Sequence, residues 1–202
     1  MGDTGPGGGI VFYVQASGDT FTSTGSPCNT AGVGGISTCK YLEAAPTTGN
    51  SAWTDVVRSW ATDTYRTTTI PGADGTDIGN GYQNTSDIIA QSDNVAATSA
   101  AVEASEYRGP NSRTDWFLPS RDELNALCKY ARNTGQAAGV DACSGGSSPT
   151  DRGFRNGGYW SSSEFNSTDA WTQYFNSGSR GIDNKANDGT FDTFYVRPIR
   201  AC

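Results

Sequence analysis

Residues 157–202, GGYWSSSEFNSTDAWTQYFNSGSRGIDNKANDGTFDTFYVRPIRAC, join two firmly patterned ends to a polar middle. The stretch opens on the aromatic and serine run YWSSSE at residues 159–164. It closes on VRPIR at residues 196–200, where apolar and basic side chains alternate. Small polar residues, aromatics and glycines fill the middle. Two structured ends around such a middle are typical of a scaffold that displays a recognition surface.

The composition allows one domain over residues 1–202, with a core that is small in aliphatic side chains and supported by aromatics. Residues 1–9 are glycine-rich, and we expect them to form a flexible lead-in. Residues 157–202 would be the display region and closing strand. The sequence contains no apolar run of about 18 residues, so we expect no insertion into a membrane.

The charge pattern excludes several function classes. The net charge is −7, from 14 basic and 21 acidic residues, which argues against binding nucleic acid. The sequence has no histidine, so histidine general bases, Ser-His or Cys-His nucleophile pairs and histidine metal sites are excluded. We therefore expect no catalysis, no cofactor and no metal, and a protein or glycan ligand as the partner. The sequence does not indicate an oligomeric state.

Five cysteines stand at positions 28, 39, 128, 143 and 202. Cys28 with Cys39 and Cys128 with Cys143 would each close a glycine- and serine-rich loop, contributing about 3 kcal/mol each. Five free thiols in a cytosolic protein are the alternative. We favour disulfides and hence an extracellular, cell-surface or virion-surface location, with the export signal outside this chain. Cys202 is left over, either free or paired with another molecule.

The local patterns predict short strands and helices. Residues 10–14 are apolar on both faces and should form a central strand. Ser120 and Glu123 form a capping box, which predicts a helix from there to a stop near Gly135. Further strands are expected at 41–46 and 115–119, and further helices at 86–91 and 95–107.

The ordered motifs GGGIVFYV, YLEAAP, DWFLPSRDEL, YWSSSE, AWTQYF and YVRPIRA resemble the Lcl-type C-terminal domain family. This family is a branch of the C-type-lectin-like fold, related to the variable proteins of diversity-generating retroelements. The resemblance implies an α+β fold with two main helices flanking short twisted antiparallel sheets, and long loops. It also implies that the N- and C-terminal strands lie side by side and that ligand binds on the face formed by the C-terminal third.

The chain departs from two relatives of that fold. It lacks the Glu-Pro-Asn or Gln-Pro-Asn triplet and the Trp-Asn-Asp strand of calcium-dependent lectins, so their sugar site is not expected. A formylglycine-generating-enzyme-like oxidase is the least favoured alternative. Its cysteine pair has no matching motif here, and the cysteines suit local disulfides better.

The resemblance also separates framework from display positions in the C-terminal stretch. Framework positions are Trp160, Trp171, Gln173, Phe175, Lys185, Val196, Arg197 and Arg200. Strand alternation places Thr172 and Tyr174 on the face opposite to Trp171 and Gln173. The expected ligand-binding residues are Phe165, Asn166, Ser167, Asp169, Thr172, Tyr174, Asn176, Ser177, Ser179, Arg180, Asp183, Asn184, Asn187, Asp188 and Phe191, with Phe194 as a further candidate.

These display residues have the composition of antibody binding loops, in which aromatics supply rigid contact area and small polar residues supply adaptable hydrogen bonds. An ordinary polar loop set with a few core phenylalanines is the alternative. Arg197 and Arg200 are expected to pair inside the fold with acids such as Glu164 or Asp122; binding of a carboxylate or sulfate group of a ligand is the alternative. The hydroxyls of the serine run at 161–163 should satisfy backbone groups in a tight turn.

Two functions follow as expectations. The first is a target-binding protein whose C-terminal region is diversified by retroelement mutagenesis of adenines, which cannot produce Lys, Glu, Gln, Met or Trp in Asn-type codons. Residues 165–194 contain Trp171, Gln173 and Lys185 from this set, which is no depletion, so the protein sequence does not decide the matter. The second is a surface adhesin domain that binds polysaccharides or glycosaminoglycans, weakened by salt and by Arg180→Ala.

Overall fold

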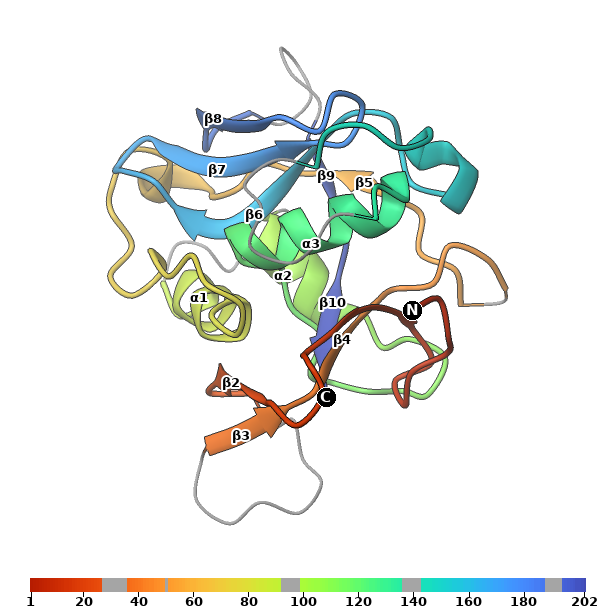
Figure 1. The fold of residues 1–202 in the computed structure, drawn as a ribbon. Coiled ribbons are helices and arrows are strands. Elements are labelled where there is room, and N and C mark those ends of the chain that lie inside the picture. The colour runs from red at the N-terminus through yellow and green to blue at the C-terminus, as the bar shows by residue number, and fades with distance from the viewer. Residues whose placement is uncertain (27–35, 50, 92–98, 136–142, 188–193) are drawn as a thin grey trace.

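The computed structural model describes residues 1–26, 36–49, 51–91, 99–135, 143–187 and 194–202. Within these residues, strands form three sheets and the helices lie among them (Figure 1). The three-stranded sheet has the order β1 (Ile10–Val14), β4 (Tyr41–Ala44), β10 (Ile199–Ala201). The five-stranded sheet has the order β5 (Val56–Val57), β9 (Phe194–Val196), β6 (Gly158–Glu164), β7 (Asp169–Tyr174), β8 (Arg180–Asn184). A hairpin pairs β2 (Phe21–Thr24) with β3 (Ile36–Cys39).

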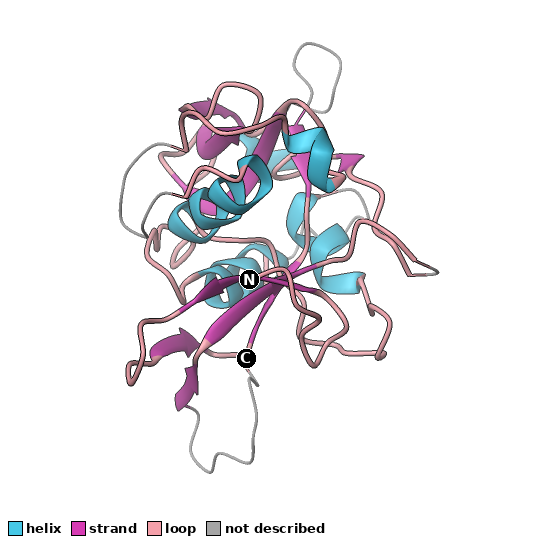
Figure 2. Cartoon of the chain, turned by 45° about the vertical axis from the view of Figure 1, so that its right-hand side comes forward, coloured by secondary structure: helices cyan, strands magenta, loops and turns pink. Residues whose placement is uncertain are grey.

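The helices are α1 (Gly81–Ile89), α2 (Ala100–Glu106) and α3 (Arg121–Arg132), with 3-10 turns η1 (Asp63–Arg66) and η2 (Pro149–Arg152). Helix α3 contacts β1 on one side and β6 and β7 on the other. Figure 2 shows the helices lying between the two larger groups of strands. This confirms the expected α+β class with predominantly antiparallel sheets.

The order of the three-stranded sheet differs from expectation. β4 is the central strand and pairs antiparallel with both neighbours, so Ala44 lies opposite Ile10 on one side and Ile199 on the other. The prediction that residues 10–14 form a central strand is therefore wrong, and the N- and C-terminal strands are separated by β4. The outer edge of β1 is covered by the chain itself. The Gly2 N–H donates to the Val11 carbonyl (2.7 Å), and the Val11 N–H donates to Asp3 (2.9 Å).

Residues 1–9, expected to be a flexible lead-in, instead fold over β4. The N–H groups of Gly7 and Gly9 donate to the two oxygens of the Glu43 carboxylate at 2.8 and 2.9 Å. A side chain at Gly9 would bring Cβ within 2.5 Å of the Ala44 carbonyl oxygen. The glycines of this segment therefore allow close backbone approach to a buried acid.

Helix α3 begins where the sequence predicted. The Ser120 hydroxyl accepts from the Glu123 N–H (3.4 Å), and the Glu123 carboxylate accepts from the Ser120 N–H (2.7 Å), which confirms the capping box. The helix ends at Arg132, because Asn133 takes the left-handed conformation with φ 53°. The cap therefore stands two residues before Gly135, the stop that the sequence indicated.

Other helices and strands begin or end at residues different from those predicted. Helix α1 starts at Gly81, five residues before the expected 86–91 segment, and α2 starts at Ala100 after its cap Ser99. The predicted start of that second helix, within 92–98, lies outside the described residues. The strand expected at 115–119 is a single bridge, in which Phe117 and Ile199 exchange backbone hydrogen bonds at 2.9 Å. Pro119 cannot donate such a bond, so the ladder does not extend in that direction.

Buried arginines pair with acids inside the fold, as expected, but with different partners. Arg200 contacts Glu43 (2.7 Å) and Asp115 (2.6 Å). Arg197 contacts Asp55 (2.7 Å), and its guanidinium lies 4.7 Å from the Phe154 ring centre. The two acids proposed from sequence, Glu164 and Asp122, bind other basic side chains: Lys185 for Glu164, and Arg121 and Arg180 for Asp122.

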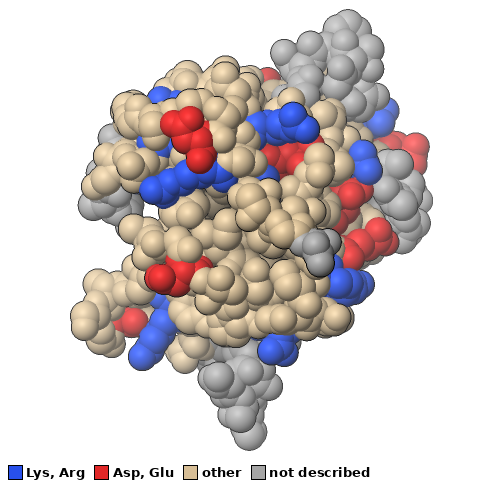
Figure 3. All heavy atoms as spheres, turned by 90° about the vertical axis from the view of Figure 1, so that its right-hand side faces the viewer, with Lys and Arg blue, Asp and Glu red and all other residues tan. Residues whose placement is uncertain are grey.

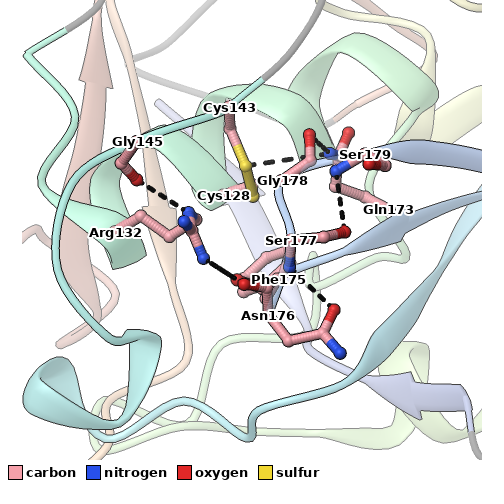
Figure 4. The surroundings of a disulfide bond; sticks show 10 residues. All are labelled: Cys128, Arg132, Cys143, Gly145, Gln173, Phe175, Asn176, Ser177, Gly178 and Ser179. Atoms are coloured by element: carbon pink, nitrogen blue, oxygen red, sulfur yellow. Dashed lines mark hydrogen bonds between the residues drawn. A yellow bond between two sulfur atoms is a disulfide. The ribbon is translucent and has the colours of Figure 1, made fainter.

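The disulfide between Cys128 and Cys143 is present, as predicted, with Cα atoms 5.9 Å apart (Figure 4). It ties the middle of α3 to the segment that contacts the turn after β7. Cys28 lies outside the described residues, so the expected bond from Cys28 to the buried Cys39 is not described. Cys202 is a free thiol and is half-buried. None of the helices in the described ranges is long and apolar enough to cross a membrane.

Candidate functional site

Strand β6 is the fixed base of the candidate site, because all seven of its residues are buried. Its serine hydroxyls bond to neighbouring backbone. Ser161 donates to the Trp171 carbonyl (2.9 Å) and Ser163 to the Gly75 carbonyl (2.6 Å). The Arg121 N–H donates to the Ser163 hydroxyl (2.9 Å), which joins the start of α3 to the sheet. The hydroxyls of Ser161 and Ser163 satisfy backbone groups, as predicted, but from a central strand rather than from a tight turn, and the Ser162 hydroxyl accepts instead from the Asn84 side-chain amide (3.3 Å).

A buried lysine fixes the turn between β6 and β7. The Lys185 ammonium contacts the Glu164 carboxylate and donates to the carbonyls of Ser167 (3.0 Å) and Thr68 (3.2 Å). Burial lowers the pKa of Lys185, and the hydrogen bond and charge of Glu164 oppose that change. The ammonium also lies 5.0 Å from the Trp60 ring centre. The turn is therefore held from beneath by side chains that are almost completely buried.

Apolar side chains gather at the surface above this base. Phe165 is 49% exposed and meets Trp171 edge-to-face, with ring centres 5.2 Å apart. Ile182, 41% exposed, lies directly opposite Trp171 in the β7–β8 ladder. The Arg121 guanidinium lies 5.3 Å from the Trp171 ring centre, within the range of cation–π attraction. We call these four residues the aromatic patch.

The charge beside the aromatic patch is largely compensated. Asp122 accepts from Arg121 (2.9 Å) and from Arg180 (2.8 Å), so one carboxylate bridges both guanidinium groups. Arg180, expected to contact ligand, is 17% exposed at its side chain and is engaged in this bridge. Figure 3 draws the side of the molecule that lies to the right in Figure 1, away from the β6–β7 turn, and there too basic side chains lie next to acidic ones. The surface is therefore better suited to contact through ring faces than to capture by net positive charge.

The opposite face of β7 is covered. Thr172 is 2% exposed, and its hydroxyl donates to the Asp183 carboxylate at 2.8 Å. Tyr174 donates to the same carboxylate oxygen at 3.1 Å, and its ring packs on Phe194. Thr172 and Tyr174 do point away from Trp171; Thr172 is buried, whereas Tyr174 and Trp171 are both half-buried. Phe194, the further candidate for ligand binding, is 1% exposed and packs in the core.

The structure divides the remaining expected residues between the two ends of β7 and β8. Phe165, Asn166, Ser167 and Asp169 meet in and beside the first turn, where the Asn166 side chain accepts from the N–H groups of Thr168 and Asp169. Asn184 is the last residue of β8 and lies opposite Asp169, and Asn187 follows three residues later. The opposite turn carries Asn176, Ser177 and Ser179, all exposed, beside the disulfide (Figure 4). Asp188 and Phe191 lie outside the described residues.

These two turns cannot contact one small ligand together, since a six-residue strand spans about 20 Å. The turn beside the disulfide is also fixed: Arg132 donates to the carbonyls of Phe175 (2.6 Å) and Asn176 (2.7 Å), and Gln173 donates to Gly178 (2.9 Å). The first turn lies next to the aromatic patch, so that end of the hairpin is the stronger candidate.

Sequence reasoning missed three residues of the aromatic patch: Arg121, Trp171 and Ile182. A signal existed for two of them. Ile182 is the single large aliphatic residue within the polar run 176–188, and Phe165 and Trp171 flank a polar turn at a spacing that lets them meet. Arg121 is the first residue of a helix remote in sequence, and no local pattern connects it with Trp171.

Comparison with known proteins agrees with the resemblance found in the motifs. A search of curated proteins finds no match. Residues 35–200 match the Lcl C-terminal domain, a range that includes β3, β4, all the helices, the five-stranded sheet and most of β10. The match covers far more than half of the 202 residues, and the chain therefore belongs to the Lcl C-terminal domain family.

Proposed function

We propose that this chain is a non-catalytic recognition domain with a C-type-lectin-like fold, which binds a macromolecular target through the aromatic patch. The observation that carries this proposal is Trp171, which is accessible at the surface although Phe165 and Arg121 hold its ring in place. Tryptophan and arginine are among the residue types most enriched at the positions that dominate binding energy at interfaces.

The scaffold beneath the patch supports the same function. Strand β6 is buried along its length, Lys185 fixes the β6–β7 turn, and the Ser163 hydroxyl ties the start of α3 to the sheet. Side chains that are held before the ligand arrives lose little conformational entropy on binding. A patch on such a base can therefore bind a target without first being ordered.

For the class of target, we favour a protein partner recognised by a variable protein of the retroelement type. The turn between β6 and β7 carries the exposed residues Asn166 and Ser167 beside the patch, and the turn between β7 and β8 carries further exposed asparagine and serine at the other end of these strands, which suits exchange of side chains on a constant framework. The coding DNA decides this point. A near-repeat of the 3′ end that differs only at adenines, beside a reverse-transcriptase gene, is expected, and its absence would contradict diversification.

A glycan-binding adhesin domain is the second candidate, because a flat ring such as that of Trp171 also suits the apolar face of a sugar. Asp122 bridges Arg121 and Arg180, so we expect glycan binding here to depend on stacking and to change little with salt. This differs from the charge-driven capture of sulfated polysaccharides that the sequence alone suggested.

The aromatic patch is tested by Trp171→Ala on an array of immobilised neutral and sulfated polysaccharides, and on the captured protein partner if one is found. We expect binding to weaken at least tenfold, which corresponds to about 1.4 kcal/mol. Val14→Ala is the matched control, because Val14 is 54% exposed on β1, away from the patch. Unchanged binding by W171A would contradict the proposal. Loss through R180A and through salt would favour charge-driven adhesion instead.

A further inference from the structure

Strand β8 is the outer strand of the five-stranded sheet and lies at the periphery of the molecule (Figure 1). The ladder fixes the direction of its backbone groups. The Tyr174 N–H donates to Ser179 (2.8 Å) and the Lys185 N–H donates to Thr168 (2.9 Å), in the same register as the five pairs of β7 with β8. Hydrogen-bonded pairs alternate along an antiparallel ladder. The N–H and C=O of Ile182 therefore point away from β7, toward the open side.

Within the described part of the chain, no strand pairs with the outer edge of β8. Natural edges are guarded by charged side chains, above all lysine, by proline, by a bulge or by a covering helix or loop. The one carboxylate of β8, Asp183, is held on the face of the sheet, where it accepts from Thr172 and Tyr174. The sequence of β8 is RGIDN, which contains neither lysine nor proline, and its register with β7 is regular. The Arg180 side chain turns to Asp122 of its own chain. Ile182, at 41% exposed, is an apolar side chain at the centre of this edge.

We propose that two copies of the chain pair along β8, antiparallel and about a two-fold axis, with Ile182 opposite Ile182 of the second copy. In this register Arg180 lies opposite Asn184, and Gly181 lies opposite Asp183. All five residues have an opposite residue and no like charges face each other; the Asn184 carbonyl, which also accepts from the Asn187 N–H of its own chain (3.0 Å), uses its second lone pair. Moving the axis toward the end of the strand would place Asp183 opposite Asp183 of the second copy, which is destabilising. Moving the axis toward the start of the strand would leave Asn184 with no residue of the second β8 opposite it.

The pairing has a consequence for the aromatic patch. A two-fold axis perpendicular to the sheet keeps the same face of both sheets on one side, so the two Trp171 rings lie on a common surface. The dimer does not depend on the proposed function. If that function holds, the dimer presents two binding patches to one target, and avidity raises the apparent affinity for a repeated ligand.

Cross-linking tests the register. In the Cys202→Ser background, Ile182→Cys and Asn184→Cys are oxidised at low protein concentration and the covalent dimer is followed with time. Residues in a hydrogen-bonded antiparallel pair have Cα atoms about 5.5 Å apart, which a disulfide can span. Two copies of residue 184 would be roughly 13 Å apart. We expect I182C to form a dimer at least ten times faster than N184C, and equal rates would overturn the proposal.

Mass measurement by light scattering tests the dimer without any new cysteine. The native chain, with a monomer mass of 21.2 kDa, should approach twice that mass as concentration rises. Ile182→Lys should return it to the monomer mass, while Val14→Lys, at another exposed apolar residue, should not. W171A should keep the dimer mass, because Trp171 lies one strand inside the edge, so loss of binding and loss of pairing are separable. A monomer at every concentration overturns the proposal.

Discussion

Two clusters in this molecule pair arginine with carboxylate, one in the buried interior and one near the surface. Arg200 lies between Glu43 and Asp115 in the three-stranded region, and all three side chains are less than a tenth exposed. Asp122 lies between Arg121 and Arg180 beside the aromatic patch, where the side chains are 17–29% exposed. The first cluster holds the start of the chain, β4 and β10 together. The second shapes a surface.

The difference shows why the charge of a residue does not reveal its role. Glu43 also accepts the N–H groups of Gly7 and Gly9, so its carboxylate is fully bonded inside the protein. Removing one member of such a cluster leaves a charge that neither water nor another group can compensate. At the surface, water replaces the missing partner, and little stability is lost.

Breaking the buried cluster around Arg200 should lower the free energy of unfolding most. Arg200→Met keeps much of the side-chain length but removes the charge that Glu43 and Asp115 contact. We expect a loss of about 3–5 kcal/mol in the free energy of unfolding, because a buried pair loses one partner. Urea denaturation followed by tryptophan fluorescence measures it. A loss below about 1 kcal/mol would show that these acids are reached by water.

A third buried acid, Glu123, extends the comparison. Glu43 contacts an arginine, whereas Glu123 is hydrogen-bonded to backbone N–H groups. Glu123 accepts from the N–H groups of Gly79 (2.9 Å) and Ser120 (2.7 Å). Burial raises the pKa of Glu123 to about 7, and these hydrogen bonds oppose the rise. Between its usual pKa near 4.5 and about 7, the native state keeps a proton that the unfolded state releases. Stability should therefore fall as pH rises through this window.

Between pH 4.5 and pH 8 we expect the free energy of unfolding to fall by up to about 3 kcal/mol, relative to the Glu123→Gln protein over the same range. Glutamine has one acceptor oxygen, so it can keep the capping-box bond from Ser120 but loses the bond from Gly79. It has no proton to lose in this pH range, so it is the matched control for the pH dependence. Urea midpoints of both proteins across this range provide the measurement. Parallel pH profiles for the two proteins would show that Glu123 is ionised in the native state throughout.

Breaking the cluster around Asp122 should change the free energy of unfolding least. Arg180→Met removes one of the two guanidinium groups that contact Asp122, and Arg121 remains. We expect a change within about 1 kcal/mol, measured in the same urea experiment as Arg200→Met. A loss as large as that of Arg200→Met would mean that the two clusters do not differ as their exposure indicates.

Local patterns were sufficient for several elements. The capping box of Ser120 and Glu123 identified the start of α3, because the signal lies within four residues. The apolar run 10–14 identified β1, but its position at the sheet edge did not follow, since apolar side chains on both faces also fit an edge covered by the preceding loop. The pairing of Arg197 and Arg200 with acids was expected, while their partners come from segments more than 80 residues away.

In the candidate site, too, some features followed from the local sequence and others only from the tertiary structure. The end of the chain that carries the exposed residues was recognisable from its polar and aromatic composition. The exposure of Trp171 and the burial of Thr172 were not, because both faces of β7 are partly covered, one by the core and one by Phe165 and Arg121. Alternation along a strand assigns faces but does not say what packs against each.

The sequence by itself determined the family, the α+β class, the start of α3, the Cys128–Cys143 bond and the region of the chain that bears the candidate surface. Each depends on residues close together or on motifs in a fixed order. Only the tertiary structure decided the strand order, the partners of the buried charges and the meeting of Arg121 with Trp171. These are contacts between distant segments, whose free energy comes from desolvation and packing that no local pattern encodes.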